Sequence, residues 1–114
     1  MADQQPTLYK LTFHVPADFL DTTKQAVFAA GGGDVAGYDQ CCWQVLGEGQ
    51  FRPKPGSTPF IGNAAQLEHV AEYHVQVMCQ AEVIEAAVAA LKQASKVLRR
   101  YISGPNVKSV ALML

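Results

Sequence analysis

Residues 8–15, LYKLTFHV, alternate between apolar and polar side chains and are followed directly by Pro16. A period of two over this length predicts a strand with one buried face. Proline ends a strand and suits the first position of a helix, so we expect a helix to begin at residue 17. The apolar side chains of the strand are Tyr9, Leu11, Phe13 and Val15.

The rest of the chain continues this pattern of strands and helices. Two further stretches alternate, two carry apolar residues at helical spacing, and the glycines at 31–33 suit the end of the first helix. The order strand, helix, strand, strand, helix, strand predicts a ferredoxin-like α+β sandwich, an antiparallel sheet with both helices on one face. The six elements are expected at 8–15, 17–30, 38–46, 67–79, 81–94 and 107–114.

The buried side of each element follows from the same spacing. In the second strand Cys41, Trp43 and Val45 are expected to face the core, with Gln40, Cys42 and Gln44 on the polar side. The helical stripes are expected at Phe19, Thr23, Ala26, Val27 and Ala30, and at Ile84, Ala87, Val88, Leu91 and Ala94.

Length and composition limit the class of protein. The chain has 114 residues, of which 49% are apolar and 17% charged, so it is expected to form one globular domain over 1–114 with a flexible start at 1–7. No apolar run approaches the roughly 20 residues that span a bilayer, and the first residues do not resemble a secretory signal. We therefore expect a cytoplasmic protein, away from membranes, with reduced cysteines. A core this small favours assembly with further copies.

The charge is unevenly distributed along the chain. Residues 1–95 carry five basic and ten acidic side chains, whereas residues 96–114 carry four basic and no acidic ones. Four cations without interleaved aromatic residues support little phosphate binding, so we expect no nucleic-acid partner. The basic C-terminal segment is typical of a solvated surface or a contact between subunits.

The polar face of the expected sheet carries possible metal ligands. His14 and His74 lie on strands expected at the centre of the sheet, with Glu72 beside His74 and Cys42 on the strand at 38–46. Imidazole, thiolate and carboxylate groups suit a divalent ion such as copper, zinc or cobalt. The alternative is a pair of structural histidines that form hydrogen bonds at an interface.

A loop rich in glycine and proline, GEGQFRPKPGSTPFIGN at 47–63, is too particular in composition for a slack linker. A short strand is expected near 50–51, with Phe51 and Phe60 as anchors. The guanidinium of Arg52 suits an anionic ligand, so these three residues form a candidate effector-binding group. Equally, Arg52 could bond loop carbonyls or Glu48.

No group of residues indicates catalysis. The chain lacks a G-x-S-x-G elbow and an H-E-x-x-H pair, and its glycine run at 31–37 follows a helix instead of opening one. We therefore expect a protein that is not an enzyme.

Residues 30–53, AGGGDVAGYDQCCWQVLGEGQFRP, and the PFIG at 59–62 resemble the YqfO family. The YKLTFHVP and LEHVAEYHV stretches resemble it too, so the similarity covers about 8–94. The family is the stand-alone form of a domain inserted in larger NGG-one-interacting-factor-three-like proteins, and that domain resembles CutA and PII-like signalling proteins. The segment QASKVLRRYISGPN departs from the His-Pro-Tyr-Glu pattern usual in relatives after the second helix.

This resemblance implies a ferredoxin-like fold that assembles as a trimer, or as a dimer or other small oligomer, without an established reaction. The link of CutA-like proteins to divalent-cation tolerance adds weight to a metal site. The sequence thus favours a non-enzymatic oligomer that binds a metal ion, a small effector or a protein partner. The alternatives are a ligand-free structural or interaction module and, through the larger relatives alone, an accessory to a metal-dependent hydrolase.

Overall fold

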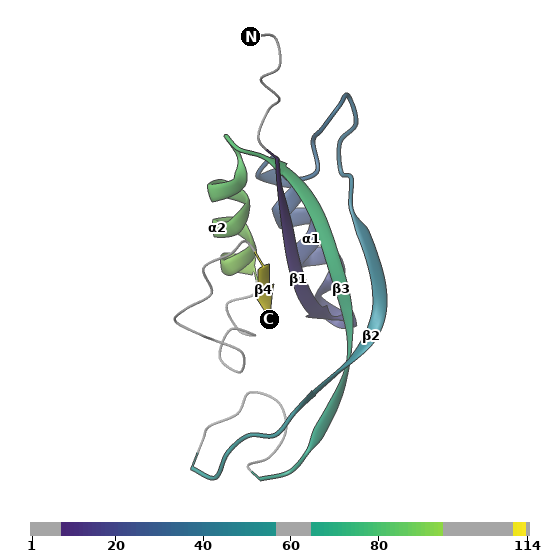
Figure 1. Cartoon of the computed structure of the whole chain (residues 1–114), viewed down its shortest axis with the longest axis vertical. Helices are drawn as coiled ribbons and strands as arrows, with labels where there is room; N and C mark the ends of the chain where they lie inside the picture. The colour runs from purple at the N-terminus through teal and green to yellow at the C-terminus, as the bar shows by residue number, and fades with distance from the viewer. Residues whose placement is uncertain (1–7, 57–64, 95–110, 114) are drawn as a thin grey trace.

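The structure, a computed structural model, describes residues 8–56 and 65–94, and residues 111–113 by their backbone (Figure 1). The expected flexible start at 1–7, most of the basic C-terminal segment expected at 96–114, and Phe60 in the loop lie outside the described residues. In chain order the elements are β1 (Leu8–Pro16), a short 3-10 helix η1 (Ala17–Phe19), α1 (Leu20–Ala29), β2 (Trp43–Phe51), β3 (Glu68–Gln80), α2 (Ile84–Ala94) and β4 (Ala111–Met113).

The strands form one sheet in the order β2-β3-β1-β4. Strand β3 is central and pairs antiparallel with β1, from Leu8↔Gln80 to Pro16↔Glu72, and antiparallel with β2, from Trp43↔Gln76 to Phe51↔Glu68. The β2–β3 pairing continues past the last β1 pair and extends beyond the helices as a curved arm (Figure 1). The arm is formed by residues 48–51 of β2 and 68–71 of β3. The predicted antiparallel sheet is confirmed for these three strands, and so is the α+β class with two helices.

The core forms where the alternating faces of β1 and β3 meet the helices. Leu11, Phe13 and Val15 are completely buried, as are Val75 and Val77 on β3. The helices contribute buried side chains at helical spacing, namely Leu20, Thr23 and Val27 from α1 and Ile84, Ala87 and Leu91 from α2. The predicted core positions are confirmed for Leu11, Phe13 and Val15 of β1 and for Ile84, Ala87 and Leu91 of α2, whereas Tyr9 is 39% exposed. No described helix covers the opposite sheet face.

The last strand does not run as predicted. β4 pairs parallel with β1, with Thr12 opposite Ala111, so the expectation of an entirely antiparallel sheet is wrong at this edge. A single crossover through α2 would leave β4 parallel to β3 and therefore antiparallel to β1. Residues 95–110, which separate α2 from β4 in the sequence, lie outside the described residues.

Strand β2 begins later than predicted, and the residues expected on its core face lie on the opposite face of the sheet. It continues to Phe51, through the first five residues of the expected loop, in which a short strand was predicted near 50–51. Trp43 and Val45 lie opposite Gln76 and His74, on the face away from the helices. Gln44 lies on the helix side, where its Oε1 accepts a hydrogen bond of 2.9 Å from the Lys24 Nζ of α1. β2 is largely exposed, so burial does not select its register.

The first helix begins in a 3-10 turn and ends in a Schellman motif. Phe19, predicted to be buried, is 41% exposed because it lies in η1, and Leu20 takes the core position instead. At the other end the Gly31 N–H donates to the Phe28 carbonyl and the Gly32 N–H to the Val27 carbonyl. Gly31 has a φ of 102°, which confirms the glycine cap.

The turn between α1 and β2 contains a strained alanine, which leads to a stability prediction. Val35 and Tyr38 exchange two backbone hydrogen bonds of 2.9 Å, and Ala36 and Gly37 between them both have positive φ. A left-handed conformation costs an L-residue roughly 1–2 kcal/mol, which exceeds the cost of ordering glycine. We expect Ala36→Gly to raise the free energy of unfolding by about 0.5–1 kcal/mol in chemical denaturation.

The matched control is Ala86→Gly on the exposed side of α2. It should lower the free energy of unfolding by about 1 kcal/mol, because helical backbone carries no such strain. Equal destabilisation by both variants would show that Ala36 is not strained in solution.

Candidate functional site

The sheet face away from the helices, here called the open face, carries most of the predicted site. Even-numbered residues of β1 and β3 and odd-numbered residues of β2 share this face. Near its middle, His14 and His74 are direct partners in the β1–β3 register, and Val45 is the partner of His74 on β2. The sheet register therefore brings together two of the four predicted metal ligands.

The two histidines form a hydrogen-bonded chain with Gln76. Nε2 of His14 and Nδ1 of His74 are 2.9 Å apart, and the amide nitrogen of Gln76 lies 3.0 Å from Nε2 of His74. An amide nitrogen can only donate, so Nε2 of His74 accepts and its Nδ1 carries the proton donated to His14. His14 is then protonated on Nδ1, a buried atom without a hydrogen-bond partner among the described residues.

Trp43 covers one side of this pair. Its ring meets the His74 ring edge-on at a centroid distance of 6.2 Å and an interplanar angle of 75°, while the two histidine rings lie 4.7 Å apart. Trp43 was predicted to face the core and so was missed as a site residue. Its place follows from the β2 register, which the sequence pattern alone does not determine.

The environment of His14 lowers its pKa below the ordinary value of 6.5. Burial is the main cause and the neighbouring His74 adds to it, while the carboxylate of Glu72 acts in the opposite direction. The folded protein thus binds a proton at His14 less readily than the unfolded chain does.

This difference predicts how stability changes with pH. Above pH 6.5 His14 is neutral in both states, and as pH falls below that value the unfolded chain takes up the proton first. We expect the free energy of unfolding to fall between pH 6.5 and the lowered pKa of His14, and His14→Gln to reduce that fall. An unchanged pH profile in the variant, measured by urea denaturation, would contradict the assignment.

The third predicted ligand, Glu72, lies on the same face but toward the arm. Its register partners are Pro16 on β1 and Gly47 on β2. A Cβ at Gly49 would collide with the Glu72 carboxylate, so the absence of a side chain there makes room for it. Glu72 contributes negative charge near His14, as its effect on the pKa of that residue indicates.

The fourth predicted ligand, Cys42, is exposed and lies one residue before β2 begins. Within residues 8–56 and 65–94, no group of three or more His, Cys, Asp or Glu side chains lies close enough together to share one metal ion. The predicted four-residue group therefore does not come together there.

The predicted effector-binding group is only partly described. Phe51 is the last residue of β2 and is partly buried, while Arg52 follows it on the exposed arm. Phe60 lies outside the described residues, so binding of an effector by these three residues stays a prediction. The third histidine, His69, is also on the arm, 3.0 Å from the Glu48 carboxylate.

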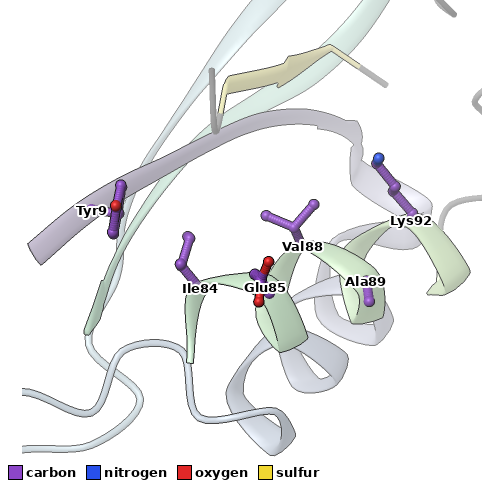
Figure 2. Close-up of a pocket in the computed structure, with 6 residues that line it drawn as sticks. All are labelled: Tyr9, Ile84, Glu85, Val88, Ala89 and Lys92. Carbon is purple, nitrogen blue, oxygen red and sulfur yellow. The ribbon is translucent and has the colours of Figure 1, made fainter. Parts of the chain in front are cut away.

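A separate hollow of about 400 Å³ lies between the start of β1 and α2, as Figure 2 shows. Its lining side chains are Tyr9, Ile84, Glu85, Val88, Ala89 and Lys92. The lining is mainly apolar and contains none of the predicted site residues.

Known proteins match the chain in sequence and in structure. It is 36% identical over 88 residues to the GTP cyclohydrolase 1 type 2 homolog of Mycobacterium leprae, covering 77% of this chain and 23% of that protein. It is 32% identical over 84 residues to the protein of the same name from Bacillus subtilis, covering 74% of this chain and 22% of that protein. The crystal structure of a Bacillus cereus protein related to NIF3 superposes with a TM-score of 0.65 at 26% identity, covering 79% of this chain and 24% of that one.

The chain is homologous to one part of these proteins. It spans about a quarter of the length of the GTP cyclohydrolase 1 type 2 homologs it matches. The resemblance to YqfO and NIF3-like proteins is thus confirmed as homology, while the CutA-like detail stays a prediction. No protein-family model matches the chain. In the part of the chain that the structure describes, no helix is long and apolar enough to cross a membrane.

Proposed function

We propose that the chain is a non-catalytic regulatory domain that packs against copies of itself through the open face of its sheet. The observation that carries this proposal is the exposure of Trp43 and Val45, at 56% and 45%, on the face that no described helix covers. Side chains of this size gain about 25 cal/mol for each Å² of apolar area removed from water. A second copy of the chain would cover them.

The charges along the open face support a second copy as the occupant. Lys10 lies toward one end of β1, whereas Glu72 lies beside Pro16 at the other end. Six residues of strand separate these positions, about 20 Å. A copy facing this sheet in the opposite direction would bring each lysine toward the other copy's glutamate, which is the self-complementarity of an isologous contact.

The resemblance to CutA and PII-like proteins is a second argument for the same proposal. It implies assembly through sheet faces and edges, with a trimer as the expected form and a dimer as the alternative. The reversed β4 departs from the ferredoxin-like pattern only at the edge, and leaves the open face of β1, β2 and β3 intact. We expect this domain to act in the cytoplasm, where its thiols stay reduced.

The single tryptophan of the chain gives a direct test of this proposal. Because Trp43 lies on the proposed contact, assembly should shift its fluorescence emission to the blue and protect it from acrylamide quenching. We expect both changes to reverse as the protein is diluted. Emission typical of a water-exposed indole at every concentration would contradict the proposal.

A further inference from the structure

The open face also holds an arrangement that self-assembly does not explain. Two of the three histidines in the chain, His14 and His74, share a single hydrogen bond at the centre of the open face. That bond leaves Nδ1 of His14 buried without a partner in the described residues. An unpartnered buried donor costs about 1–3 kcal/mol, and a metal bound at Nε2 of His14 would leave this donor unpartnered as well, so the case for an ion depends on the two facing nitrogens, Nε2 of His14 and Nδ1 of His74.

The spacing of the facing nitrogens is close to that of two ligands on one metal ion. Imidazole nitrogens bind zinc at 2.0–2.1 Å, so two of them in a tetrahedral site lie about 3.3 Å apart. Nε2 of His14 and Nδ1 of His74 are 2.9 Å apart. A separation larger by a few tenths of an ångström, with a small rotation of the tilted rings, would admit an ion between them.

The protons on both rings can be arranged to suit such an ion. His14 is already protonated on Nδ1, which leaves its Nε2 lone pair free to bind. In His74 the proton would have to move from Nδ1 to Nε2, so the ring stays neutral and no proton is lost. Gln76 would turn its amide to present the oxygen, and accept from that new Nε2–H.

This rearrangement would give Gln76 the position of an outer-shell partner. Histidines that bind metals usually donate their second N–H to an oxygen that fixes the ring, and Gln76 lies 3.0 Å from the required nitrogen. The charge of Glu72 favours a cation nearby.

We propose that His14 and His74 bind one divalent transition-metal ion, of the copper and zinc class, with Gln76 orienting His74 and water completing the coordination. Binding should be tighter for copper than for zinc or cobalt at a site made of imidazole nitrogen. Both protein ligands come from one chain, and the site lies on the face that the proposed assembly would cover.

Isothermal titration of the 114-residue chain with Zn²⁺ and Cu²⁺ tests the site, with His69→Ala as the matched control. His69 is the third histidine and lies on the arm beside Glu48, away from the pair. We expect one ion per chain for wild type and for His69→Ala. His14→Ala and His74→Ala should each lose at least tenfold in affinity, and Gln76→Ala about 10–100-fold.

Two spectroscopic readouts on wild type keep the test decisive if a variant fails to fold. Zn²⁺ should move the His74 proton from Nδ1 to Nε2, which is visible in the ¹⁵N shifts of the ring. Cu²⁺ should quench Trp43, whose ring lies 6.2 Å from that of His74. The proposal is overturned if wild type shows no saturable binding, if the tautomer stays unchanged, or if folded His14→Ala and His74→Ala bind as wild type does.

Discussion

Replacing Phe13 with alanine is expected to lower the free energy of unfolding by about 3–5 kcal/mol. Phe13 is completely buried at the centre of β1, between the β3 strand and the helices, and it is among the largest of the fully buried side chains. Truncation removes its apolar contacts and leaves a cavity that rigid strands cannot close. Since small domains are stable by only about 5–15 kcal/mol, much of the margin would be lost.

Urea denaturation followed by circular dichroism measures this loss. The matched control is Tyr38→Ala in the turn before β2, since Tyr38 is also aromatic but is 71% exposed. We expect the control to change the free energy of unfolding by less than about 0.5 kcal/mol. If Phe13→Ala and Tyr38→Ala unfolded with the same urea midpoint and slope, the placement of Phe13 in a core on the helix side of the sheet would be wrong.

Replacing Trp43 with glutamate is expected to dissociate the assembly without unfolding the domain. Trp43 is 56% exposed in the single chain, so a polar residue there should be tolerated. In a contact between copies, the same carboxylate would be buried without a partner, which costs about 3–5 kcal/mol. The dissociation constant should therefore rise by roughly a hundredfold or more.

The control for this second prediction is Tyr38→Glu, which adds the same charge to another exposed aromatic position. Tyr38 lies in the turn with Val35, outside the sheet. We expect it to leave the dissociation constant within about threefold of wild type, since surface changes rarely exceed 0.5 kcal/mol. A Trp43→Glu protein that associates as tightly as Tyr38→Glu would place the contact elsewhere.

The strands whose faces were predicted correctly are those in which only one register buries the apolar side chains. In β1 and β3, moving the pattern by one residue would expose Phe13 and Val75 and bury the histidines, so alternation alone identifies the core face. β2 lacks this constraint because Trp43, Val45 and Leu46 are all exposed, on both of its faces. Its register instead depends on pairing with β3, which no local pattern reports.

The candidate site was predictable where it lies on β1 and β3, and not where it depends on β2. His14 and His74 were expected on one face because both strands have a clear parity, and the register brings them together. Trp43 was assigned to the wrong side because its position depends on β2, and Cys42 lies before that strand begins. The direction of β4 is not indicated by the hydrophobic spacing of residues 107–114, since alternation is the same for either direction. Arg52, Phe51 and Phe60 stay a predicted effector group.

Sedimentation velocity of the chain, from low to high micromolar concentration, tests the central claim most directly. A single copy has a mass of 12.3 kDa. We predict a species of two or three times this mass at the higher concentrations, and a single copy for Trp43→Glu under the same conditions. A wild-type protein that sediments as one 12.3 kDa copy throughout would contradict assembly through the open face.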